Sequence, residues 1–201
     1  MQRALSLRRG QILEWFTLAC CLLETSVGLL SGAQHNSVAL LSFGAQSFVE
    51  VASATVLIWR LGNDHHHSHD VERRALRIEG YCFFAIALYV SADSARALSQ
   101  REAPTLSVAG IALALFSLVV MPLLAAAKRK VSRSVSSDAL EADAKQSALC
   151  GYFAGILLLG LILNQGVHVW WADSVASLVM VPLILAEGKR ALEGKSCSHC
   201  H

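Results

Sequence analysis

The sequence is poor in charged residues, and this shortage indicates its class. Asp, Glu, Lys and Arg make up 16% of the 201 residues, whereas a soluble globular domain usually carries about a quarter. Hydrophobic residues make up 54%, and the mean hydropathy is +0.48. The net charge of +2 gives no reason to expect a nucleic-acid partner. This composition argues against an ordinary soluble domain and favours a membrane protein.

The sequence also lacks features that many enzymes show. No nucleophile and base occur at a recognisable spacing. The segments between the apolar stretches are too short to form a separate soluble domain. We therefore expect neither catalysis nor a second globular domain. A function, if encoded here, is expected to lie within or beside the membrane.

Six apolar stretches are long enough to cross a membrane. A helix rising about 1.5 Å per residue needs about 20 residues to cross a hydrocarbon core about 30 Å thick. The first stretch lies behind a basic start without a convincing cleavage site, so we expect it to be retained as a helix. The sequence predicts an all-α membrane protein with six transmembrane helices in a domain at 1–190 and a tail at 191–201. We place the helices at 12–31, 37–60, 79–98, 105–127, 139–164 and 168–187.

The positive charges are distributed unevenly between the predicted loops. Fourteen Lys and Arg residues fall on one side of the membrane, whereas two, Arg96 and Arg101, fall on the other. Loops rich in Lys and Arg stay on the cytoplasmic side. We therefore predict a multi-pass protein of the cell membrane with both termini in the cytoplasm.

Polar residues recur at matching positions of two predicted helices. Gln46 and Glu50 lie one helical turn apart, and Gln146 and Cys150 repeat this spacing 100 residues later. Transporters commonly place their substrate site at the interface of such internal repeats, near the middle of the membrane. Other matched pairs are Ser37 and Ser137, Ala39 and Ala139, Leu40 and Leu140, and Ser47 and Ser147.

Further acidic residues lie within the predicted helices. A carboxylate inside a membrane is costly and normally faces the bundle interior with a partner. Glu24, Asp143 and Asp173 are therefore candidates for an ion path. For Glu24, a protonated structural hydrogen-bonding role is the alternative. Glu14, next to Trp15, is expected to lie at the membrane interface instead.

Histidine and cysteine gather in two segments outside the predicted helices. Imidazole and thiolate side chains bind zinc and similar metals, so we predict two accessory metal-binding segments. For the first segment, loose surface binding without a defined role is the alternative. The first is a cytoplasmic loop at 62–75 with His65, His66, His67 and His69, and the second is the tail with Cys197, His199, Cys200 and His201.

The sequence resembles the cation diffusion facilitator (cation efflux) family of six-helix metal/proton antiporters. The resemblance rests on residues 37–53 and 139–150, and residues 170–178 match the opening of the family's last helix. It implies a cation-efflux-type bundle, a homodimer, and a transport site at Gln46, Glu50, Gln146 and Cys150. The family usually has Asp and His at these positions. The 14 residues after Glu187 leave no room for the family's C-terminal cytoplasmic domain, as in its short branch.

The resulting hypothesis is a divalent metal cation transporter, with zinc as the expected cargo. Ionised Glu50 and a Cys150 thiolate would together neutralise a divalent cation, and the thiolate favours zinc or cadmium over magnesium or calcium. Burial favours the protonated form of both groups in the empty protein, so metal entry would displace protons, as antiport requires. No cofactor beyond the transported metal is implied. The alternative is a non-transporting membrane protein that binds metal or has a regulatory role.

Overall fold

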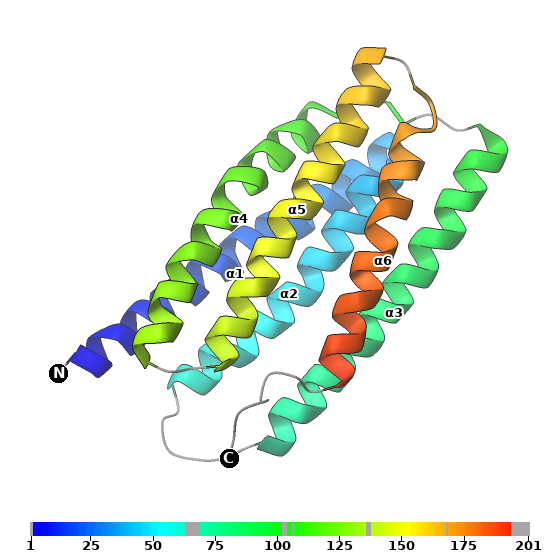
Figure 1. Cartoon of the computed structure of the whole chain (residues 1–201). Helices are drawn as coiled ribbons and strands as arrows, with labels where there is room; N and C mark the ends of the chain where they lie inside the picture. Colours follow the sequence, from blue (N-terminus) through cyan, green and yellow to red (C-terminus); the bar gives the residue numbers. More distant parts are fainter. Residues whose placement is uncertain are drawn as a thin grey trace.

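The protein, represented by a computed structural model, forms an elongated bundle of long helices (Figure 1). The structure describes residues 2–62, 69–101, 104–105, 107–135, 138–167 and 169–193, and these residues form no strand. The prediction of an all-α fold is thus confirmed. The helices are α1 (Gln2–His35), α2 (Val38–Gly62), α3 (His69–Gln100), α4 (Val108–Val135), α5 (Asp138–Val167) and α6 (Ala172–Leu192).

Five of these helices, α1 to α5, are long and apolar enough to cross a membrane. The sixth, α6, is not among them, although it runs beside α3 and α5 in the same bundle (Figure 1). Asp173 and Glu187 of α6 enclose an uncharged stretch of 13 residues. That stretch forms about 20 Å of helix, which is shorter than a hydrocarbon core of about 30 Å. The described residues thus form an all-α membrane bundle with five candidate membrane spans.

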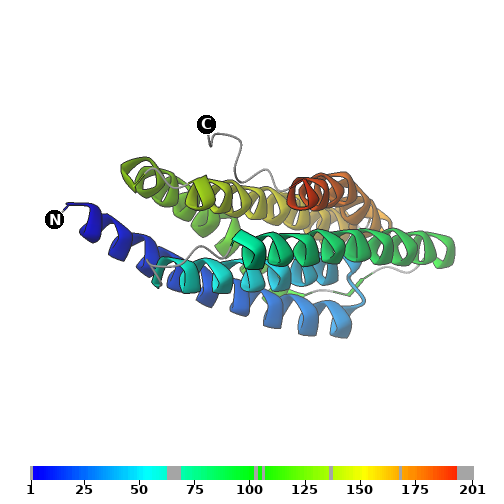
Figure 2. The same cartoon turned by 90° about the horizontal axis from the view of Figure 1, so that it is seen from below.

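The helices pack in three main pairs, α1 with α2, α4 with α5, and α3 with α6. The first two pairs meet through contacts between α1 and α4 and between α2 and α5. In Figure 2, α4, α5 and α6 lie in one layer and α1 and α2 in another. The helices α1, α2, α4 and α5 therefore share one interior, and α3 and α6 flank it.

Polar and apolar side chains are distributed in the way expected for a membrane bundle. Large apolar side chains such as Phe16, Leu88 and Leu123 are exposed on the outside, whereas Glu24 and Glu50 are buried. In lipid, an apolar outer surface carries no penalty, and ionisable groups normally face the bundle interior. A functional site is therefore expected in the interior that α1, α2, α4 and α5 share.

Two glycines allow α1 and α2 to approach each other closely. A Cβ atom at Gly44 would lie 2.7 Å from the backbone nitrogen of Leu29, and one at Gly28 would lie 2.8 Å from the Cα atom of Gly44. Small residues permit this kind of contact between membrane helices. The close approach also brings Ser47 of α2 within hydrogen-bonding distance of Glu24 of α1.

We predict that Gly44→Ala lowers the melting temperature of the protein in detergent by several degrees. The added methyl group would meet backbone atoms of α1 that cannot move independently, and overpacking of this kind costs about 1–3 kcal/mol. Gly155→Ala is the matched control, because its Cβ would meet only the Leu118 side chain at an ordinary distance of 3.5 Å. Equal melting temperatures for the two variants would contradict the prediction.

Candidate functional site

Ionisable side chains gather in the interior shared by α1, α2, α4 and α5. Glu14, Glu24 and Lys128 have no exposed surface, and Glu50 is 3% exposed. Burying an ionisable group in a membrane protein is costly unless it has a partner. Each of these side chains does have hydrogen-bond partners on neighbouring helices.

Glu24 of α1 is the point at which four helices are joined. Its carboxylate accepts hydrogen bonds from α2, α4 and α5, and both oxygen atoms are used. The donors are Ser117 Oγ, 2.6 Å from Oε1, and Ser47 Oγ and Cys150 Sγ, 2.9 Å and 3.4 Å from Oε2. These hydrogen bonds support a structural role for Glu24. A role of Glu24 in an ion path is a proposal, based on its central position in the bundle.

Glu50 of α2 forms a second group with partners on α1 and α2. Gln46 donates a hydrogen bond from Nε2 to Glu50 Oε1 over 2.9 Å, across the single helical turn that the spacing predicts. Cys21 of α1 donates from Sγ to Glu50 Oε2 over 3.6 Å, a long contact that suits the larger sulfur atom. Glu50 also lies near enough to Glu24 for the two carboxyl groups to interact electrostatically.

Two of the four residues expected as transport ligands, Gln46 and Glu50, contact each other directly. Cys150 contacts Glu24 instead, and Gln146 is half-buried one turn before Cys150. Among the described residues, no group of three or more His, Cys, Asp or Glu side chains is arranged to hold a metal ion. The structure instead presents two neighbouring carboxyl–thiol pairs, Glu24 with Cys150 and Glu50 with Cys21.

Cys21 is a site residue that sequence reasoning missed. It is fully buried and reads in the sequence as a small apolar filler, as most buried cysteines are. Its spacing from Glu24 was the available signal, because residues three apart share one face of a helix. A helix face that carries both a thiol and a carboxyl group inside a membrane is unusual enough to mark a candidate site.

A separate ion cluster surrounds the side chain of Lys128. The ammonium group contacts Asp143 Oδ2, Glu14 Oε2 at 3.2 Å and Ser147 Oγ at 3.3 Å. Glu14 is therefore buried with an ionic partner, and its position at the membrane interface stays a prediction. Lys128 was counted among the fourteen loop cations, which is wrong because it lies within α4. The helix α4 continues to Val135, and Lys128 is buried in the bundle, where its ammonium group pairs with both carboxyl groups. Lys145, in contrast, is exposed and pairs with Glu141 over 3.2 Å.

Asp173 lies at the opposite end of the bundle and joins α6 to the start of α2. Its Oδ1 accepts a hydrogen bond from Ser37 Oγ over 2.6 Å, and its Oδ2 accepts one from the backbone N–H of Ala39 over 3.2 Å. The first N–H groups of a helix have no partner within the helix, and a carboxylate there also interacts favourably with the helix dipole. Helix capping accounts for these contacts of Asp173.

Of the expected accessory metal ligands, His69 lies within the described part of the chain. His69 is the first residue of α3. The remaining accessory residues lie outside the described residues: His65, His66, His67, Cys197, His199, Cys200 and His201.

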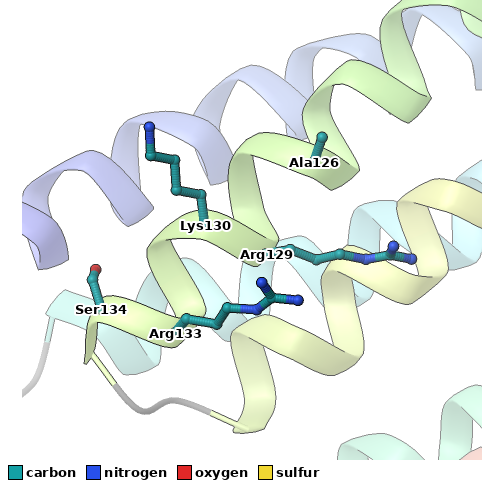
Figure 3. Close-up of a pocket in the computed structure, with 5 residues that line it drawn as sticks. All are labelled: Ala126, Arg129, Lys130, Arg133 and Ser134. Atoms are coloured by element: carbon teal, nitrogen blue, oxygen red, sulfur yellow. The ribbon is translucent and has the colours of Figure 1, made fainter.

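A surface pocket lies at the basic end of α4 (Figure 3). Its lining includes Arg129, Lys130 and Arg133, together with Ala126 and Ser134. In Figure 3 the two arginine side chains extend to one side of α4 and Lys130 extends to another. Three positive charges repel metal cations and attract anionic groups such as lipid phosphates. The pocket is therefore separate from the candidate cation site inside the bundle.

Comparison with known proteins gives a distant similarity to a transmembrane protein. No family model matches the sequence. The chain is 23% identical over 181 residues to "Transmembrane protein 163" of Xenopus laevis, a similarity that covers 89% of this chain. The chain spans 64% of the length of that relative. Together with the five apolar helices, this similarity indicates that the chain is a multi-pass, all-helical membrane protein.

Proposed function

We propose that the protein transports divalent metal cations, with zinc as the main cargo, through a site formed by Glu24, Glu50, Cys21 and Cys150. The observation that supports this most directly is the burial of two carboxyl groups and two thiols between α1, α2 and α5. Ionisable groups inside a membrane are costly, and they typically mark ion pathways. The resemblance to cation efflux proteins points to the same function, to export from the cytoplasm and to a homodimer.

The chemistry of the four side chains fits a divalent cation. Two ionised groups among the four, such as Glu50 and Cys150, neutralise the two positive charges of the cation, which is necessary in a site shielded from water. The other two groups keep their protons. Thiolate sulfur favours zinc and cadmium over magnesium and calcium. In the structure each thiol donates its hydrogen to a carboxyl group, Cys150 to Glu24 and Cys21 to Glu50.

Coupling to protons follows from these contacts. A cation must displace the hydrogen of a thiol before it can bind the sulfur as a thiolate. The released protons can then move in the opposite direction to the metal, which gives antiport. Cation binding would also draw Glu24 and Glu50 together, because one ion replaces two separate carboxyl–thiol contacts. Such a shift would move α1 relative to α2 and α5.

Metal flux in sealed proteoliposomes tests the proposal. The full chain is reconstituted with a zinc-sensitive dye inside the vesicles, and an opposing proton gradient is imposed. We expect zinc entry above the rate of protein-free vesicles and an accompanying pH change. Zinc binding by equilibrium dialysis without any flux would favour the alternative, a non-transporting metal-binding protein.

The histidine loop and the tail are expected to tune metal supply without being required for transport, because both lie outside the predicted membrane spans. Deleting residues 64–70 and 196–201 together should weaken the apparent affinity for zinc and leave the maximal flux largely unchanged. The dependence of flux on zinc concentration in proteoliposomes measures both quantities. Complete loss of flux in a monodisperse double-deletion protein would show that these segments take part in translocation.

A further inference from the structure

The ion cluster of Glu14, Lys128, Asp143 and Ser147 borders the carboxyl–thiol site. Glu14 precedes Glu24 by ten residues of α1, and Asp143 precedes Cys150 by seven residues of α5. These separations correspond to about 15 Å and 10 Å along the two helices. The start of α1, the end of α4 and the start of α5 lie at the same end of the bundle (Figure 1). The two carboxyl groups of the cluster therefore form a polar layer on that side of the carboxyl–thiol site.

The contacts of the Lys128 ammonium group outline a cation site built from oxygen atoms. The ammonium contacts one oxygen each of Glu14, Asp143 and Ser147. These oxygen atoms come from α1 and α5, whereas the ammonium reaches them from α4. The three helices thus place carboxylate and hydroxyl ligands around one positive charge that is shielded from water.

One further oxygen atom in this layer has no partner. The second carboxylate oxygen of Glu14, Oε1, is buried, and it accepts no hydrogen bond within the described part of the chain. An ammonium group has three hydrogens to donate, and here three contacts already use them. A metal ion is not limited to three ligands, because hard divalent cations take six or more oxygen ligands. A metal ion at the ammonium position could therefore bind the oxygen that Lys128 leaves unsatisfied.

The charges of the layer lead to the same conclusion. One ammonium group balances only one of the two carboxyl groups when both are ionised. A divalent cation in place of the ammonium would compensate both carboxylates. Buried charges are tolerated when they are paired or bound to a metal.

We propose that Glu14, Asp143 and Ser147 form a second cation site, for divalent cations that favour oxygen ligands, in which the ammonium of Lys128 takes the place of the cation when the site is empty. A cation enters this site by displacing a tethered side chain rather than by filling an open cavity. Because binding alone tests the site, its failure would leave the proposed transport through Glu24 and Glu50 untouched.

The test compares Mn²⁺ binding by full-length variants in detergent, counted by electron paramagnetic resonance. Mn²⁺ is the probe because it favours oxygen ligands. Lys128→Met removes the ammonium group and keeps an unbranched side chain, so we expect one additional Mn²⁺ per chain relative to the wild type. Lys128→Arg keeps a positive charge and should show no gain. Any Mn²⁺ bound by the histidine loop or the tail is common to all variants and cancels in the comparison.

A double variant distinguishes the proposed site from a general increase in negative charge. Lys128→Met with Asp143→Asn should lose the additional Mn²⁺, whereas Lys128→Met with Glu141→Gln, a change at an exposed carboxylate, should keep it. An unchanged count in Lys128→Met, or a gain that survives Asp143→Asn, would overturn the proposal. If Lys128→Met aggregates without a divalent cation, Mn²⁺ should restore a monodisperse protein where K⁺ at equal ionic strength does not. Failure of that rescue would equally overturn it.

Discussion

Glu50→Gln should abolish zinc flux in proteoliposomes while leaving the helical bundle folded. The substitution keeps the size of the side chain, and the Gln46 amide can still donate to the remaining carbonyl oxygen of residue 50. It removes the negative charge that a divalent cation needs in a site shielded from water. Changes to groups that merely support a metal ligand cost about 10–100-fold, so loss of a charged ligand should lower flux by about 100-fold or more.

Two further variants make this result specific. Glu141→Gln alters a carboxylate on the surface of α5 that pairs with Lys145 over 3.2 Å, and it should transport at the wild-type rate. Cys150→Ser keeps a hydrogen-bond donor for Glu24 but removes the sulfur. It should retain flux and shift the preference away from zinc and cadmium. Normal flux in a monodisperse Glu50→Gln protein would mean that the transported ion does not bind Glu50.

The features that depend on short-range spacing could be predicted from the sequence. The long apolar stretches predict helices because a membrane-spanning segment must satisfy its own backbone hydrogen bonds. The contact between Gln46 and Glu50 follows from their spacing of four residues on one helix. Both features are fixed within a single helix, so neighbouring helices have little influence on them.

The partners of the buried charges could not be predicted in the same way. Lys128 follows directly after an apolar stretch, and a buried lysine there has the same sequence signature as the first lysine of a loop. Its environment depends on how α4 is rotated against α1 and α5, which brings Glu14 and Asp143 to it from 114 and 15 residues away in the sequence. The ionic partner of Glu14 could not be predicted for the same reason.

The 100-residue repeat also shows how equal positions acquire different roles. Ser47 and Ser147 occupy matching positions on α2 and α5. Ser47 donates a hydrogen bond to the Glu24 carboxylate, whereas Ser147 lies 3.3 Å from the Lys128 ammonium. The repeat places a hydroxyl group on each helix. The adjacent helix, α1 or α4, determines which charged group that hydroxyl contacts.

Glu24→Ala should cause a large loss of stability. The change leaves the hydroxyl groups of Ser47 and Ser117 and the Cys150 thiol without their acceptor. Hydrogen bonds between membrane helices contribute about 0.6 kcal/mol on average and up to about 1.7 kcal/mol each. Loss of three such bonds should therefore lower the free energy of unfolding by about 2–5 kcal/mol. Denaturation of the purified protein in mixed micelles measures this quantity, and Glu141→Ala on the exposed surface serves as the control.

A double-mutant cycle decides whether the hydrogen bonds, rather than the loss of side-chain volume, cause this effect. Ser117 Oγ lies 2.6 Å from Glu24 Oε1 and comes from a different helix. Once Glu24→Ala has removed the acceptor, Ser117→Ala should cost less than it does in the wild type, because the hydroxyl group has already lost its partner. The difference should fall between about 0.6 and 1.7 kcal/mol. Strictly additive losses would show that Glu24 stabilises the bundle by filling space, and the junction of four helices at its carboxylate would then have no energetic role.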